Sequence, residues 1–248
     1  MKKLFSLHRY AHHAIAFVLA LFAAGMTFVT LNDYGIVWDE PYYFSQADSY
    51  NRWFVRPVIE KKDAVFEVKS DFDIHPPFRK IVGGVTKYIF TDRLKTLDNT
   101  RGYRISGLIF VIPFVYVFAL MALEMGGVFA GILGTLLFIF LPHNVFLAPL
   151  LTLDYAVAAL WFICLVTLRW GMKKKPLLLV SAITLGLTLL TKLHGVFLYI
   201  PVFLYILHRY VNNAVHTHQT RWSYILLLLV FLLVPLLVYV AGWPWLWT

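Results

Sequence analysis

Two adjacent carboxylates, Asp39 and Glu40, stand in the stretch VWDEPYYF, directly after the first long apolar run of the chain. Consecutive residues do not share a face of a helix, so these two side chains are poorly placed to share one proton. We expect one carboxylate to face a cavity and the other to pair with a cation. A carboxylate in a cavity can accept the proton of an incoming hydroxyl group, which is general-base chemistry.

Few charges accompany the later apolar runs. Only four fall within or at the ends of the second to sixth runs, and these are Arg104, Glu124, Asp154 and Lys192. Charges at membrane depth are costly and by default indicate function. With the N-terminus in the cytoplasm, all of them except Glu124 lie at outer ends of spans, which is also the side of the Asp39-Glu40 pair.

Each charge taken alone has an ordinary explanation. Lys192 could snorkel to lipid headgroups, and Arg104 could anchor the interface. Asp154 could be a favourable charge at a helix N-terminus, and Glu124 a solvated residue beside two glycines. Together, an acid pair facing cations across an outer cavity fits displacement at a carbon that bears a phosphate. The base would act on one side, and Lys192 with Arg104 would hold the phosphate on the other.

The composition places this chemistry in a membrane. The chain has 248 residues, of which 60% are hydrophobic and 14% charged, with a mean hydropathy of +0.71. Soluble domains are closer to half apolar and a quarter charged, so water-soluble enzymes and nucleic-acid binding are excluded despite the net charge of +9. The single cysteine, Cys164, excludes an intrachain disulfide and a cysteine zinc site.

The apolar runs predict an all-α polytopic membrane protein with about seven transmembrane helices. The runs lie at 14–31, 105–123, 127–148, 151–168, 177–191, 195–207 and 223–241. Residues 177–207 are too long for one span, so TKLHG at 191–195 is a predicted turn. The first run is long enough to span, and we expect an uncleaved anchor rather than a signal peptide. The bias of Lys and Arg places the N-terminus inside.

The segment 32–102 is then outside, and it holds 11 of the 13 acids. Tyr43, Ala47, Tyr50 and Phe54 repeat at helical spacing after Pro41, and a second apolar stripe follows Pro76-Pro77 at Phe78, Ile81, Val82, Val85 and Ile89. Amphipathic helices of this composition lie in the plane of the membrane interface. We therefore expect two interfacial helices in this outer loop, within a single module that covers residues 1–248.

Five motifs in order resemble the GT-C superfamily of membrane glycosyltransferases, closest to glycosyltransferase family 39 (protein O-mannosyltransferases and aminoarabinose transferases). They are VWDEPYYF, HPPFRKIV, RGYRISGLIF, LLTLDYAVAAL and GLTLLTKLHGVFLYIPVF. The resemblance implies an inverting transfer of a sugar from a polyprenyl-phosphate donor to an acceptor hydroxyl on the extracytoplasmic side. The acceptor could be a protein, a lipid or a glycan.

The resemblance also implies roles for single residues. Asp39 would be the general base and Glu40 would organise the site. Lys192 would contact the donor phosphate with support from Arg104. The remaining expected substrate-binding residues are His75, which could instead cap the loop before two prolines, Asp154 and Tyr43. Tyr42 and Trp38 either line the sugar site or anchor the interface.

Other expectations stay open at the level of sequence. His75, Asp39 and Glu40 have no metal-ligand spacing, so we expect transfer without a cofactor or metal, although a divalent ion at these residues is an alternative. Family members usually continue past the seventh span, so we expect incomplete acceptor recognition or a C-terminal partner chain. The alternatives to an enzyme are a non-catalytic or truncated lipid-binding subunit and, less favoured, an anionic-lipid transporter. We expect a bacterial inner membrane, with the site facing the periplasm.

Overall fold

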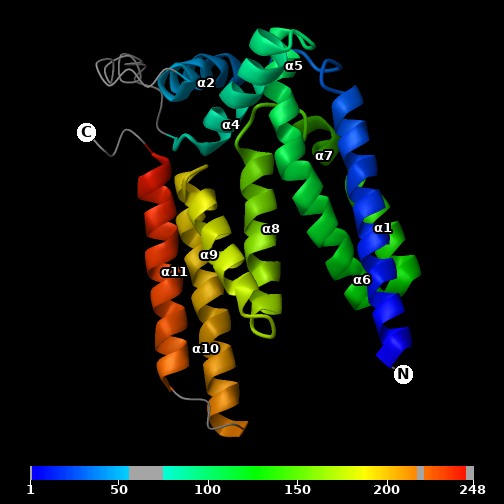
Figure 1. The fold of residues 1–248 in the computed structure, drawn as a ribbon, viewed down its shortest axis with the longest axis vertical. Helices are drawn as coiled ribbons and strands as arrows, with labels where there is room; N and C mark the ends of the chain where they lie inside the picture. The colour runs from blue at the N-terminus through cyan, green and yellow to red at the C-terminus, as the bar shows by residue number, and fades with distance from the viewer. Residues whose placement is uncertain (1, 56–74, 217–220, 244–248) are drawn as a thin grey trace. The chain divides into compact units, whose positions relative to one another are not determined.

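The computed structural model describes residues 2–55, 75–216 and 221–243, and every regular element in these ranges is a helix (Figure 1). The chain divides into two compact units. Unit 1 comprises Met1–Ser70 and Arg79–Ala159, and unit 2 comprises Asp71–Phe78 and Leu160–Thr248. The prediction of an all-α protein is confirmed for the described residues.

Unit 1 contains most of the shorter elements. Its helices are α1 (Lys2–Val29), α2 (Glu40–Val55), α4 (Phe78–Lys87), the π-helical turn η2 (Tyr88–Arg93), α5 (Asn99–Arg104), the 3-10 turn η3 (Ile105–Gly107), α6 (Leu108–Ile139), α7 (Pro142–Leu147) and the start of α8 (Asp154–Gly171). Unit 2 contains the rest of α8, α9 (Pro176–Leu189), the 3-10 turn η4 (Leu193–Leu198), α10 (Tyr199–His216) and α11 (Arg221–Gly242).

Within the described residues, five helices are long and apolar enough to cross a membrane, as judged by length and composition. They cover Tyr10–Val29, Asn99–Ile139, Asp154–Gly171, Leu193–Asn212 and Ser223–Gly242. Such a set is characteristic of a multi-pass membrane protein. The count is lower than the seven spans expected, because helix α9 has only 14 residues and because the predicted spans 105–123 and 127–148 both fall on α6.

Helix α6 is a hairpin of two arms. Gly127 interrupts it with φ 73° and ψ −175°, a backbone conformation that essentially only glycine adopts. Phe118 and Phe138 would be about 30 Å apart along a straight helix, yet their rings stack with centroids 4.3 Å apart. The chain therefore folds back at Gly127, where the sequence predicts the boundary between two spans. The second arm ends at Ile139, which is too early for a full span.

Helix α1 packs along α6 (Figure 1). Its buried residues Ala16, Leu19, Ala20, Ala23 and Ala24 recur at helical spacing. Four of these five are alanines, which let two helix backbones approach closely in a membrane environment. His13 Nδ1 lies 2.6 Å from the Tyr116 hydroxyl across the same contact. This packing fixes where α1 ends relative to the start of α6, and the candidate site lies at that end.

Helices are present at both predicted positions of the segment 32–102, as α2 and α4, and their placement at the membrane interface stays a prediction. In α2 the predicted stripe includes Ala47 and Tyr50, which are buried, whereas the side chain of Phe54 lies outside the described residues. Helix α4 differs from expectation because its buried residues are not the apolar ones. They are Arg79, Lys80, Gly83, Gly84 and Thr86, while Val85 and the following Ile89 are exposed.

The structure gives a reason for this arrangement of α4. A Cβ built on Gly84 would lie 2.4 Å from the carbonyl oxygen of Ala47, and a Cβ on Gly83 would lie 2.6 Å from a methyl carbon of Leu151. The two glycines therefore let this face of α4 approach α2 and Leu151 more closely than residues with a Cβ would allow. The basic residues on that face are carried inward with it.

In unit 2, α9 packs on α11 through Gly186, where a Cβ would lie 2.9 Å from the Cα of Pro235. The core behind this contact includes Cys164, Leu185, Leu198 and Phe231. Helix α9 ends at Leu189, and Lys192 adopts an extended conformation (φ −154°, ψ 133°) before η4 begins. The predicted turn at TKLHG is confirmed.

Candidate functional site

The acid pair lies at the end of unit 1 where α1 stops and α6 and α8 begin. Glu40 is the first residue of α2 and is fully buried, as is Arg104 at the end of α5. The guanidinium binds the carboxylate in a bidentate manner, with Nε–Oε1 at 2.9 Å and Nη2–Oε2 at 2.6 Å. One of the two adjacent carboxylates thus pairs with a cation, and its partner is Arg104.

Both members of this ion pair also hold the surrounding backbone. Arg104 donates to the carbonyl oxygens of Leu31, Tyr34 and Gly35 at 2.8–2.9 Å, so all five of its N–H donors are used by protein acceptors. Glu40 accepts from the backbone N–H groups of Val37 and Leu151 as well. The pair therefore ties the loop after α1, the start of α2 and the loop before α8 into one polar core.

Asp39 has a different environment from its neighbour. Its side chain is exposed, and Trp38 beside it is 87% exposed. The backbone around it is fixed, because the Asp39 carbonyl oxygen accepts from the Tyr43 N–H at 3.1 Å and the Glu40 N–H donates to Val37 at 3.0 Å. Glu40 thus points into a buried network and Asp39 into open space, because neighbouring residues at the start of a helix point in different directions.

Two buried cations lie in unit 1 that sequence reasoning did not select. Arg79 donates to the Ser106 hydroxyl and to the Leu150 carbonyl oxygen, and its guanidinium lies 5.2 Å from the Phe110 ring centroid. Burial lowers the pKa of Arg79 to about 9, against the opposing attraction of Glu40, so it stays charged at neutral pH. Lys80 is fully buried, with its ammonium 5.9 Å from the Tyr50 ring centroid.

A signal for these two cations was present in the sequence. Arg79 and Lys80 lie on the same helical face as the glycine pair 83–84. Glycines mark the side on which a helix packs closely, so cations on that side are carried into the protein. The motif HPPFRKIVGG therefore indicates a basic buried face as well as the apolar stripe.

The other residues selected from the sequence in unit 1 lie around this core. Tyr43 is half-buried against the cluster of Ala47, Tyr103 and Leu151. Asp154 is exposed at the first turn of α8, three residues after the Leu151 N–H that binds Glu40. The loop before α8 thus brings Asp154 to the same end of unit 1 as the Asp39-Glu40 pair.

His75 and Lys192 belong to unit 2. The Phe78 N–H donates to the Leu190 carbonyl oxygen at 3.0 Å, which joins the His-Pro-Pro segment to the end of α9. Both His75 and Lys192 are half-buried. The backbone of Lys192 is held by its N–H to Thr188 at 3.0 Å and by its carbonyl oxygen, which accepts from Gly195 at 2.8 Å. His75 and Lys192 come from separate sequence motifs. The hydrogen bond between Phe78 and Leu190 joins the two segments of unit 2 that carry them.

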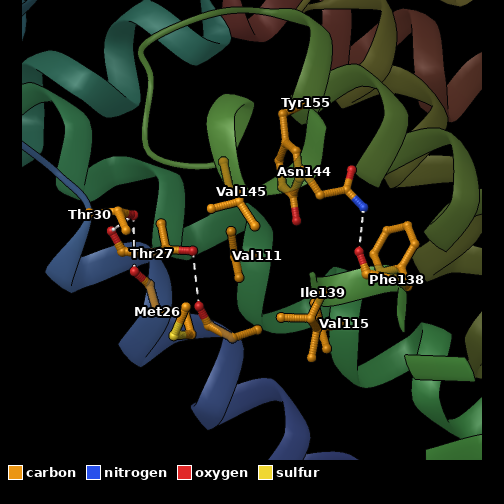
Figure 2. Close-up of a pocket in the computed structure, with 12 residues that line it drawn as sticks. Met26, Thr27, Thr30, Val111, Val115, Phe138, Ile139, Asn144, Val145 and Tyr155 are labelled. Carbon is orange, nitrogen blue, oxygen red and sulfur yellow. Dashed lines mark hydrogen bonds between the residues drawn. The ribbon is translucent and has the colours of Figure 1, made fainter. Parts of the chain in front are cut away.

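A cavity lies deeper in unit 1, between α1, both arms of α6, α7 and α8 (Figure 2). Its volume of about 20 Å³ suits a single water molecule rather than a sugar or a lipid. Several of its polar groups are already bonded, since Thr27 donates to Ala23, and the Asn144 amide donates to Phe138 at 2.7 Å. This cavity is not a substrate site.

No group of three or more His, Cys, Asp or Glu side chains in the described ranges is arranged to hold a metal ion. The alternative of a divalent ion at His75, Asp39 and Glu40 therefore finds no such group among the residues described.

Comparison with models of protein families, with curated proteins and with solved structures yields no match.

Proposed function

We propose that the chain is a membrane glycosyltransferase of the GT-C type, closest to family 39. In this proposal it transfers a sugar from a polyprenyl-phosphate donor to an acceptor hydroxyl on the extracytoplasmic side, with inversion. The observation that carries the proposal is the division between the two carboxylates. Glu40 is clamped by Arg104, and this leaves the adjacent Asp39 exposed on a fixed backbone.

The reaction needs one proton acceptor and one place for a phosphate. Asp39 accepts the proton of the acceptor hydroxyl as its oxygen forms a bond to the anomeric carbon. The bond between that carbon and the phosphate oxygen breaks, and its electron pair leaves with the polyprenyl phosphate. Lys192 is assigned to this phosphate, because an ammonium stabilises the charge that develops on the leaving oxygen. No cofactor takes part in this scheme.

Arg104 receives a different role from the one that the resemblance implies. Its five N–H donors are already bound to Glu40 and to three carbonyl oxygens. It is therefore proposed as a positioning residue that holds Glu40 and the loop carrying Asp39. The substrate contact that the resemblance assigns to Arg104 moves to Lys192 alone in this proposal, with His75, Asp154 and Tyr43 as further substrate-binding residues.

The membrane placement is also part of the proposal. We assign seven crossings in a bacterial inner membrane. They are the five long helices, the second arm of α6 continued by α7, and the short helix α9. The site then faces the periplasm, and Arg169 and Lys173–Lys175 lie in the cytoplasm. The exposed Val85 and Ile89, opposite the packed face of α4, are proposed to rest on the membrane surface.

The test compares Asp39→Asn with a matched control, Asp33→Asn, which removes another exposed carboxylate of the same loop. Membranes containing the full chain supply protein, lipid and glycan acceptors, and labelled polyprenyl-phosphate sugars are the donors. Transfer should fall about 10²- to 10⁴-fold for Asp39→Asn and stay within about twofold for Asp33→Asn. Equal activity of the two variants would refute the role of Asp39.

A chain that binds polyprenyl phosphate without transferring sugar would instead be a lipid-binding subunit. Binding of polyprenyl phosphate to the purified chain, compared between wild type and Lys192→Ala, separates these cases. The enzyme hypothesis is supported if polyprenyl-phosphate binding is lost in Lys192→Ala and sugar transfer is lost in Asp39→Asn. Binding without transfer for every donor supports the subunit, and a C-terminal partner chain would then be sought.

A further inference from the structure

From residue 155 onward, every formally charged side chain of the chain is a lysine or an arginine. After Asp154 the sequence contains no Asp or Glu, and it contains seven Lys and Arg residues, which are Arg169, Lys173, Lys174, Lys175, Lys192, Arg209 and Arg221. The Leu160–Thr248 segment of unit 2 therefore contains no Asp or Glu, and the two aspartates of the unit, Asp71 and Asp73, belong to its other segment, Asp71–Phe78. The long segment is strongly basic, which favours an anionic ligand.

A groove in unit 2 gathers two of these cations. It has a volume of about 420 Å³ and lies where α8 ends, α9 and α11 begin, and α10 passes. Lys175 and Arg209 line it together with an apolar wall that includes Leu178, Leu226 and Val230. This volume is in the range of sites that hold a small ligand or part of a lipid.

Arg209 is held in a way that leaves part of it without an acceptor. Its carbonyl oxygen accepts from the Tyr224 hydroxyl at 3.3 Å, which fixes its backbone against α11. Its Nε is buried and has no hydrogen-bond partner in the described part of the chain. A buried donor of a charged group left unpaired is costly, so such a donor is normally met by an acceptor. Arg209 also lines the groove, so an anion bound there would lie beside this guanidinium group.

We infer that this groove binds an anionic phospholipid. The headgroup phosphate accepts hydrogen bonds from Arg209 and Lys175, and an acyl chain lies along the apolar wall. A soluble anion would not use that wall, of which Leu226 is 63% exposed. A zwitterionic lipid would bring its own cation to a segment that already has only positive charges. Basic pockets between spanning helices recognise anionic headgroups in this way.

This lipid site is separate from the place proposed for the donor phosphate. Lys175 precedes the first turn of α9 and Lys192 follows its last turn. Seventeen residues separate them, which corresponds to about 25 Å along a helix. One phosphate therefore does not reach both lysines, and the two sites are tested independently.

The experiment uses the full chain, purified in a neutral detergent, and counts bound lipid by native mass spectrometry. The probes are phosphatidylglycerol and phosphatidylcholine with the same acyl chains. Wild type should bind one phosphatidylglycerol at least about tenfold more tightly than phosphatidylcholine. Arg209→Gln should weaken phosphatidylglycerol about five- to tenfold and leave phosphatidylcholine unchanged. The control is Lys173→Gln. Lys173 is an exposed cation in the same loop as Lys175 but does not line the groove, so this change should alter the affinity for either lipid less than twofold.

A second pair of variants tests the apolar wall. Leu226→Gln should weaken both lipids, whereas Ile225→Gln, also exposed on α11 but outside the groove, should not. Both positions face outward, so folding is retained and the test holds even where Arg209→Gln unfolds the chain. Equal affinity of wild type for the two lipids overturns the inference. So do equal effects of Arg209→Gln and Lys173→Gln, which would indicate only diffuse surface charge.

Discussion

Replacing Glu40 with glutamine should destabilise unit 1 more than any change to an exposed acid. Each carboxylate oxygen accepts two N–H groups, Oε1 from Arg104 and Leu151 and Oε2 from Arg104 and Val37. A glutamine offers one oxygen and one NH₂ group. In either orientation of the amide, two N–H donors therefore face another donor in a place without water, and the buried guanidinium loses its counter-charge.

The magnitude follows from the geometry of the pair. At the closest N–O distance of 2.6 Å, two unit charges attract by about 6 kcal/mol for an effective dielectric constant near 20. Desolvation of both groups offsets much of this attraction. Removing one partner nevertheless leaves the other charge buried, and such changes lower the free energy of unfolding by about 3–5 kcal/mol. We expect Glu40→Gln near the lower end, because the amide keeps one acceptor.

The assay is unfolding of the purified chain by SDS titration from mild detergent, followed by circular dichroism. Asp33→Asn is the control and should change the free energy of unfolding by less than about 0.5 kcal/mol. The double variant Glu40→Leu with Arg104→Met should be less destabilised than the sum of its two single variants by about 2 kcal/mol. Additive effects within about 0.5 kcal/mol would refute the reasoning, because they would mean that the pair is not coupled.

Three further predictions concern separate features. Gly84→Ala should destabilise the chain by about 1–3 kcal/mol in the same titration, because the new Cβ would lie 2.4 Å from a carbonyl oxygen, whereas Gly25→Ala, with open space around it, should not. Burial alone would raise the pKa of Asp98, but its hydrogen bonds from Arg101 lower the net value. The ionised Asp98 side chain therefore stabilises the fold at neutral pH, and this contribution is lost as the pH falls below the ordinary aspartate range. Wild type should have a higher free energy of unfolding than Asp98→Asn at neutral pH, and the difference should disappear when the titration is repeated in acid. Lys192→Ala should weaken polyprenyl-phosphate binding about tenfold or more in a lipid-binding assay, while Lys174→Ala should not.

The sequence predicts the acid pair well because adjacency alone separates the two side chains. Consecutive residues at a helix start point in different directions, so the sequence predicts that one carboxylate pairs with a cation and the other faces a cavity. The ion pair is confirmed at Glu40, and the cavity at Asp39 stays a prediction. The partner of Glu40 could not be chosen in the same way. The predicted topology places Arg79, Arg104 and Lys192 all on the outer side of the membrane, so each could have paired with Glu40. The packing of α5 against the loop after α1 selects Arg104.

Helix α4 shows a second limit of sequence reasoning. Its apolar stripe and its helical spacing were visible, but a stripe can face either lipid or protein, since both environments are apolar. The glycine pair decides which face packs, and Arg79 and Lys80 are buried as a result. The number of spans has a similar difficulty. The break at Gly127 was readable from its sequence, whereas the early end of the second arm at Ile139 was not.

The central claim is that Asp39 accepts a proton during transfer from a lipid-linked sugar. The most direct measurement is the rate of polyprenyl-phosphate release from a labelled donor in membranes that contain the full chain and supply the acceptor hydroxyl groups. It is made for wild type, Asp39→Asn and Asp33→Asn. We predict release by Asp33→Asn within about twofold of wild type and a loss of at least about 100-fold for Asp39→Asn. Release by Asp39→Asn at the wild-type rate would contradict the account.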